Sequence, residues 1–177
     1  MKELLKLARE TLEAYFNGKE PNVSEDIKKK YSEEKACFVT LTKNGELRGC
    51  VGSLEARQEL WKDVVENSIN AAFNDSRFPE LTSGELKKIK IEVSVLSIPG
   101  KISFTNIEEL KKKIWKKGVI IKKGWNSATY LPQVWEEISD KEEFLGSLCL
   151  KAGLNINAWK EKNVEVLVYE VKKIKEK

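Results

Sequence analysis

The feature that most constrains this chain is an Asn44-Gly45 pair inside the stretch ACFVTLTKNGELRGCVGSL, residues 36–54. An Asn-Gly pair between two alternating segments favours a type I′ turn, because both central residues of that turn need positive φ angles. A two-residue loop also fixes the register of the strands, so that Lys43 faces Glu46. The sequence therefore predicts a β-hairpin over these residues.

The predicted register determines which side chains share a face of the hairpin, because directly opposed residues point to the same side. One face carries Cys37, Val39, Leu41, Arg48 and Cys50. The other face carries Phe38, Thr40, Thr42, Leu47 and Val51. Arg48 and Cys50 then lie side by side, and we expect the guanidinium to favour the thiolate form of the cysteine.

Two glycines, Gly49 and Gly52, flank this thiol. A glycine inside a strand marks a bulge, or a place where another group approaches the backbone closely. We therefore treat Cys50 and Arg48 as candidate catalytic residues. Arg48 and the two glycines are also candidate ligand-binding residues.

Each of the two catalytic candidates also has a structural interpretation. Cys50 is either a nucleophile or redox thiol, or a small buried apolar side chain. Arg48 either clamps a carboxylate or phosphate with two parallel hydrogen bonds, or forms a buried ion pair with Glu92 or Asp75. These alternatives stay open for both residues. The other two cysteines, Cys37 and Cys149, are expected in the core.

Three more residues are candidates for ligand binding. Asp75 and Arg77 lie in the break that follows the central helix, where they either complete a polar cluster or pin the loop. We favour pinning. Glu92 is the acid within an alternating strand, and we expect it to face solvent unless that face of the sheet is covered.

Several kinds of chemistry lack the residues they need. The chain contains no histidine, which excludes Ser-His-Asp and Cys-His catalysis and histidine metal ligands. Its three cysteines lack the spacing of a zinc site, and no phosphate-binding glycine motif occurs, so we assign no metal and leave any cofactor unknown. No apolar run approaches the roughly 20 residues that span a bilayer. An odd number of unpaired cysteines predicts reduced thiols and a cytoplasmic protein.

The charged residues are mostly lysine and glutamate, with a net charge of +4, which is a composition typical of thermophilic proteins. The basic residues are spread along the chain instead of forming one stripe. The segment 115–125, with Trp115, Trp125 and four lysines, comes closest to a nucleic-acid footprint. Because basic clusters are usually solvated surface, nucleic-acid binding ranks third among our hypotheses.

A pattern of two strands, a helix and a third strand occurs twice. The expected elements are the hairpin 37–53, helix 59–74 and strand 88–98, then the hairpin 118–131, helix 140–152 and strand 163–171. We predict an α+β fold of mostly antiparallel sheets with packed helices. The two ββαβ-like halves form two lobes of one domain with a cleft between them, a common place for ligands. The domain spans 1–177, with N-terminal helices in 1–33, a first half in 34–100 and a second half in 101–177.

Four segments resemble one known family: LRGCVG, NAAFNDSRF, IEVSVLS and ATYLPQVW. Together they identify the chain as a stand-alone archaeal or bacterial type of member of the AMMECR domain family. The resemblance covers nearly the whole chain. It implies an α+β fold and leaves the biochemical activity undetermined. It also implies Memo-like and radical-SAM proteins as partners.

Two functional hypotheses follow. The first is a small-molecule-binding protein, or a thiol-dependent enzyme or accessory factor, that acts through a cleft at Arg48 and Cys50. The second is a non-catalytic protein-interaction or scaffold module, in which the same motif only holds the hairpin in place. Exposure separates them, because the first needs both side chains in an open pocket and the second needs both buried and satisfied.

Overall fold

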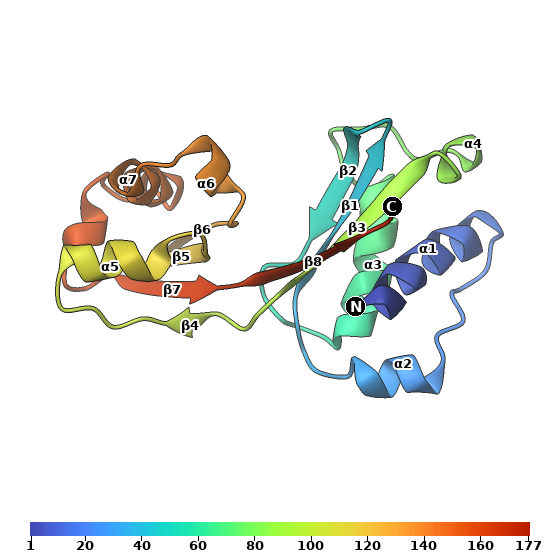
Figure 1. Cartoon of the computed structure of the whole chain (residues 1–177), viewed down its shortest axis with the longest axis horizontal. Coiled ribbons are helices and arrows are strands. Elements are labelled where there is room, and N and C mark those ends of the chain that lie inside the picture. The colour runs from blue at the N-terminus through green and yellow to red at the C-terminus, as the bar shows by residue number, and fades with distance from the viewer. The chain divides into compact units, whose positions relative to one another are not determined.

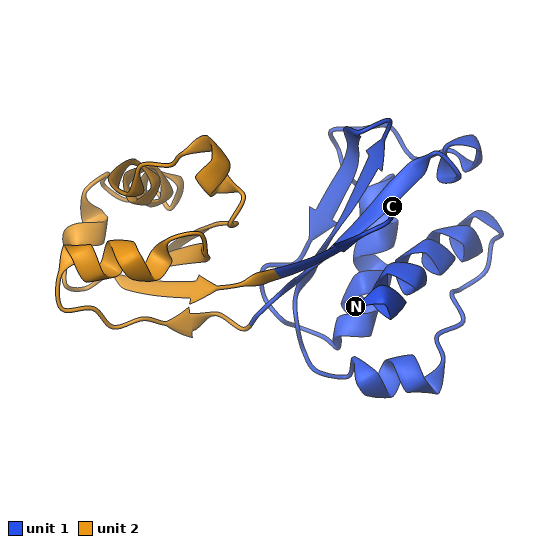
Figure 2. Ribbon diagram, viewed as in Figure 1, with its two compact units in different colours: residues 1–97, 172–177 blue, residues 98–171 orange.

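The computed structural model describes all residues, 1–177, and divides the chain into two compact units (Figures 1 and 2). Unit 1 consists of residues 1–97 and 172–177, and unit 2 consists of residues 98–171. Each unit contains one four-stranded antiparallel sheet with helices, which confirms the predicted α+β class. No helix is both long and apolar enough to cross a lipid bilayer.

Unit 1 has a sheet with the strand order β2-β1-β3-β8. Its strands are β1 (Cys37–Lys43), β2 (Glu46–Gly52), β3 (Ile89–Leu96) and β8 (Val171–Lys175). Its helices are α1 (Lys2–Phe16), α2 (Glu25–Lys30), α3 (Leu60–Phe73) and α4 (Ser83–Leu86).

One face of this sheet forms the core of unit 1. Leu4 and Leu12 of α1 and Val64 of α3 pack on it, together with Val39 and Ile91 from alternate positions of the strands. The two short helices also contribute partly buried side chains to the same core. All four helices of unit 1 therefore lie on one side of its sheet, and we call the other side the helix-free face.

Unit 2 has a sheet with the strand order β4-β7-β5-β6. Its strands are β4 (Gly100–Lys101), β5 (Gly118–Lys123), β6 (Asn126–Tyr130) and β7 (Glu165–Tyr169). Its helices are α5 (Ile107–Ile114), α6 (Val134–Glu137), α7 (Lys141–Lys151) and a 3-10 turn (Ala158–Lys160). In its core Trp135 stacks on Phe144, with ring centroids 3.6 Å apart.

The repeated ββαβ pattern is confirmed, because β2-β1-β3 and β6-β5-β7 have the same strand order. In each sheet the fourth strand comes from the segment that follows the ββαβ pattern of the other unit. Thus β4 follows β3 and pairs with β7, whereas β8 follows β7 and lies beside β3. The cleft predicted between the halves stays a prediction.

The C-terminal segment corrects the predicted boundary of the second half, which placed all of 101–177 together. Residues 172–177 belong to unit 1, and the predicted strand 163–171 is followed by a further strand, β8. Two contacts explain this return. Ile174 packs against the core of unit 1, and the Glu176 carboxylate accepts hydrogen bonds from Arg9 and from the Ile91 backbone N–H.

The β1–β2 hairpin has the predicted turn but a different register beyond it. Asn44 and Gly45 both have positive φ, and Lys43 pairs with Glu46. A bulge then interrupts the ladder, and Cys50 pairs with Thr40 instead of Val39. The predicted faces are therefore wrong for the second strand, because one extra residue moves every later side chain to the opposite face.

The extra residue in the bulged strand is Arg48, since Leu47 pairs with Thr42 and Gly49 with Leu41. As a result Cys50 lies on the helix-free face with Thr40, and Val51 packs against the core of unit 1.

Gly49 lies where β2 passes closest to α3. A Cβ atom at position 49 would lie 2.0 Å from the backbone oxygen of Ala71. A Cβ atom at Gly52 would lie 2.3 Å from the Cγ atom of Phe38. The predicted bulge or close approach at these glycines is confirmed, and the groups that approach them belong to the protein itself.

The contact at Gly49 can be tested by adding one methyl group. We expect Gly49→Ala to lower the free energy of unfolding by about 1–3 kcal/mol, because the strand must move away from α3. The matched control is Gly84→Ala in α4, where a Cβ atom meets nothing within 4 Å and the change should be neutral or slightly stabilising. Urea unfolding followed by circular dichroism measures both. Equal stability of the two variants would contradict the close packing.

Candidate functional site

Arg48 is held by α4 and the loop before it. Its Nε and Nη2 atoms donate hydrogen bonds of 3.1 Å to the two carboxylate oxygens of Glu85, and Nη2 also donates to the Glu80 backbone oxygen. Only 11% of the Arg48 side chain is exposed. The predicted partners, Glu92 and Asp75, are therefore wrong, although the interpretation as an internal ion pair is correct.

Glu85 is the centre of this ion pair. Lys43 donates to its Oε1 atom over 2.8 Å, and Thr82 forms a capping box with it at the start of α4. Hydrogen bonds from Arg48, then from Lys43 and Thr82, hold the pKa of the Glu85 carboxyl far below its usual range. Because its guanidinium is occupied in this way, Arg48 fastens β2 to α4.

Asp75 and Arg77 hold the backbone of Cys50 on the outer edge of the sheet. The Cys50 N–H donates to Asp75 Oδ2 over 2.8 Å, and Arg77 Nη2 donates to the Cys50 carbonyl over 3.1 Å. β2 is an edge strand, so these two side chains satisfy backbone groups that another strand would otherwise bind. These contacts fasten the loop after α3 to β2, as in the interpretation that the two residues pin the loop.

Asp75 and Arg77 are also paired with each other. Arg77 donates from Nε to Asp75 Oδ1 over 2.9 Å and from Nη2 to Oδ2 over 2.7 Å. The hydrogen bonds from Arg77 are the main reason that the pKa of Asp75 lies far below its usual range. Arg77 keeps 55% of its side chain exposed, and its Nη1 group makes no hydrogen bond to the protein.

The thiol of Cys50 differs from the other two thiols in its surroundings. Its Sγ atom lies 3.1 Å from the Oγ1 atom of Thr40, and the residue is half-buried. Cys37 and Cys149 are fully buried, as predicted, and burial raises the pKa of both. Cys50 is therefore the one cysteine of this chain that is not fully buried.

A row of polar side chains crosses the helix-free face next to this thiol. Thr40 pairs with Cys50 on one side and with Glu92 on the other. The Oε1 atom of Glu92 lies 3.4 Å from Ser94 Oγ and 3.9 Å from Lys173 Nζ. Glu92 lies on this face with 28% of its side chain exposed.

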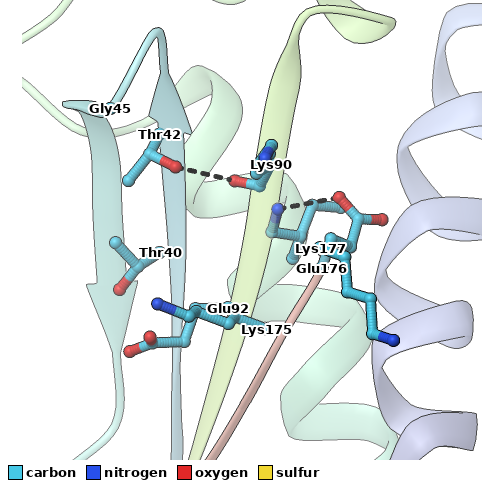
Figure 3. A pocket seen from close by; sticks show the side chains of 9 residues that line it. Thr40, Thr42, Gly45, Lys90, Glu92, Lys175, Glu176 and Lys177 are labelled. Atoms are coloured by element: carbon cyan, nitrogen blue, oxygen red, sulfur yellow. Dashed lines mark hydrogen bonds between the residues drawn. The ribbon is translucent and has the colours of Figure 1, made fainter.

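A pocket of about 390 Å³ lies on the same face (Figure 3). It is lined by Thr40, Thr42, Gly45, Lys90, Ile91, Glu92, Lys175, Glu176 and Lys177. Figure 3 shows the side chains of Glu92 and Lys175 extending across the strands toward Thr40. Thr40 therefore belongs both to the pocket and to the contact with Cys50.

The structure thus brings together only some of the predicted site residues. Cys50, Asp75 and Arg77 are in direct contact. Glu92 is separated from Cys50 by Thr40, which pairs with both residues. Arg48 binds α4, and the two glycines serve internal packing. The sequence interpretation missed Thr40 and Lys175 as site residues, because their side chains join the site only through the bulge and the return of β8. Nowhere in the chain do three potential metal ligands cluster.

The fold and this site define an α+β protein of two linked ββαβ units with one half-buried cysteine on a helix-free sheet face. The sequence matches the model of the AMMECR1 family over residues 5–174. The chain therefore belongs to the AMMECR1 family.

Similar proteins occur in archaea and bacteria. A protein of Nanoarchaeum equitans is 42% identical over 171 residues, which cover 94% of this chain and 95% of that protein. A protein of Aquifex aeolicus is 38% identical and is covered to 93% of its length by this whole chain. The crystal structure of an uncharacterized protein from Pyrococcus horikoshii matches with a TM-score of 0.81 and 34% identity, covering 98% of this chain and 90% of that one. These relatives leave the activity of the family undetermined.

The ion pair at Glu85 predicts a defined dependence of stability on pH. A carboxyl whose pKa is lowered by folding stabilises the protein above its unfolded pKa of about 4.5, and this contribution is lost as the pH falls. We expect Glu85→Gln to cost about 1–3 kcal/mol at neutral pH and progressively less in acid. Urea unfolding at neutral and at acidic pH measures the difference.

The control for this experiment is Glu46→Gln at the exposed end of the hairpin, which should change stability little at either pH. A cost of Glu85→Gln that stays constant down to strongly acidic pH would show that the charge of Glu85 does not stabilise the fold.

Proposed function

We propose that this protein binds a small molecule on the helix-free face of the unit 1 sheet and uses the Cys50 thiol there, as a thiol-dependent enzyme or accessory factor. One observation carries the proposal. Cys50 is half-buried and its thiol contacts the hydroxyl of Thr40, which lines a pocket, whereas the other two cysteines are fully buried. A reactive thiol needs this kind of access, and a structural one does not.

Arg77 supplies the positive charge that the sequence assigned to Arg48. The pKa of Arg77 is raised, first by its hydrogen bonds to Asp75, and its Nη2 group also donates to the Cys50 carbonyl over 3.1 Å. The exposed Nη1 group retains two N–H donors for an anionic group of a ligand. In this proposal Cys50 is the nucleophile and Arg77 stabilises its negative charge.

Glu92 has a separate role in the proposal. It lies two strands away from Cys50, which corresponds to roughly 10 Å at the usual spacing of strands. At that distance the carboxylate does not take a proton directly from the thiol. It contacts the part of a ligand that extends from Cys50 across Thr40.

The second candidate is a non-catalytic interaction module, and one observation favours it. Arg48, Gly49 and Gly52 are all used in internal contacts, as expected if the LRGCVG motif only holds the hairpin in place. Memo-like and radical-SAM proteins, suggested by the family resemblance, would be the partners. Nucleic-acid binding ranks third, because Trp115 packs against Trp135 and Lys123 pairs with Glu161.

Thiol labelling tests the first candidate. In the folded protein we expect one thiol to react with a thiol reagent at least about tenfold faster than the other two, because only Cys50 is accessible without local unfolding. Cys50→Ser should remove the fast phase, whereas Cys37→Ser and Cys149→Ser should retain it. Denaturant should make all thiols react alike. Mass spectrometry of the labelled protein identifies the residue.

The role of Arg77 has its own matched comparison. Arg77→Gln should slow the labelling of Cys50 several-fold, because it removes a cation that contacts Cys50 through the backbone carbonyl at 3.1 Å. Arg57→Gln is the control, since Arg57 is an exposed arginine paired with Glu55. If all three thiols react slowly and alike in the folded protein, the thiol proposal fails and the interaction module is the better account. A metabolite-binding screen of the wild type and Cys50→Ser then shows which ligand depends on the thiol.

A further inference from the structure

We propose that the pocket beside Cys50 binds a small oxyanion, a phosphate or carboxylate group of the ligand, through the ammonium groups of Lys90 and Lys175. This inference rests on the proposed function, because it names the chemical class of the ligand that the Cys50 site would accept.

Three lysines line the pocket, namely Lys90, Lys175 and Lys177, and none of them forms an ion pair. The two lining carboxylates are both occupied. Glu176 is bound to Arg9, with Oε2 at 2.5 Å from Arg9 Nη2, and to the Ile91 N–H. Glu92 has Lys173 and Ser94 as its neighbours. The pocket therefore has an excess of positive charge.

The shape of the pocket agrees with a small ligand. Its volume of about 390 Å³ falls within the range of small-molecule sites, roughly 300–1,000 Å³. Thr40 and Thr42 also line the pocket. The Thr40 hydroxyl can donate a hydrogen bond to an oxyanion, whereas the Thr42 hydroxyl already donates to the Lys90 backbone oxygen. Because Thr40 Oγ1 lies 3.1 Å from Cys50 Sγ, a ligand anchored in the pocket extends its remaining atoms toward the thiol.

The strand β8 provides a control for unspecific attraction. Lys173 and Lys175 alternate with Lys172 and Ile174, and Ile174 packs into the core. Lys172 thus carries the same charge on the same strand but points to the opposite face from Lys175. If an anion is attracted only by the overall charge of β8, the loss of Lys172 lowers its affinity as much as the loss of Lys175.

Isothermal titration calorimetry with pyrophosphate and, separately, with citrate tests the inference at low and at physiological salt. We expect binding of at least one of them at low salt, weakened by added salt. The double variant Lys90→Ala/Lys175→Ala should raise the dissociation constant at least about tenfold, which is 1.4 kcal/mol. Lys172→Ala should leave it nearly unchanged. The tighter of the two anions assigns a phosphate or a polycarboxylate ligand.

Two results would overturn the inference. One is the absence of binding at low salt, and the other is an equal loss of affinity in Lys172→Ala and in the double variant. Cys50→Ser separates this inference from the proposed function, because it should bind the anion as well as the wild type. If the anion binds but all three thiols are labelled slowly, only the thiol proposal is rejected. If Cys50 is labelled fast but no anion binds, only the anion-binding pocket is rejected.

Discussion

The close approach of β2 to α3 is the constraint on which the candidate site depends. With Gly49 directly against the Ala71 carbonyl, no side chain fits at that position, and the strand must turn Gly49 toward the helix. The next residue, Cys50, then points to the helix-free face, because successive residues of a strand alternate. The loop after α3 places Asp75 and Arg77 against the backbone of Cys50. The helix α3 therefore packs against the strand, and the loop that follows it holds the edge of the strand.

Most side chains of the LRGCVG motif are used in internal contacts, whereas the Cys50 thiol is not part of the core. Arg48 is bound to Glu85, the glycines fill tight contacts, and Val51 packs into the core. Leu47 is exposed, and the thiol of Cys50 lies beside Thr40, which also lines the adjoining pocket. The internal contacts of the motif are thus compatible with a functional thiol, since they fix where that thiol lies.

Local patterns made much of the fold predictable. The Asn44-Gly45 turn and the ββαβ order of both units appear as expected. These features depend on neighbouring residues. Buried Cys37 and Cys149 were predicted for the same reason, since each lies within an apolar pattern.

The features that escaped prediction depend on distant residues or on a single inserted residue. The two glycines indicate an irregular strand, but the sequence does not show that Arg48 is the extra residue, because Cys50 and Val51 are both acceptable on a buried face. Arg48 and Glu85 are 37 residues apart, and their pairing follows from the position of α4. The lysine-rich segment 172–177 has the composition of a solvated tail, and only Ile174 and Glu176 reveal its contacts with unit 1.

The most direct test of this account is a crystal structure of the protein soaked with a mercury compound, which binds accessible thiols. The account predicts mercury at the Cys50 sulfur, on the side of the sheet that carries Thr40, with the Arg48–Glu85 ion pair intact. A Cys50 side chain packed under the helices, with Val51 on the helix-free face and no mercury beside Thr40, would contradict it.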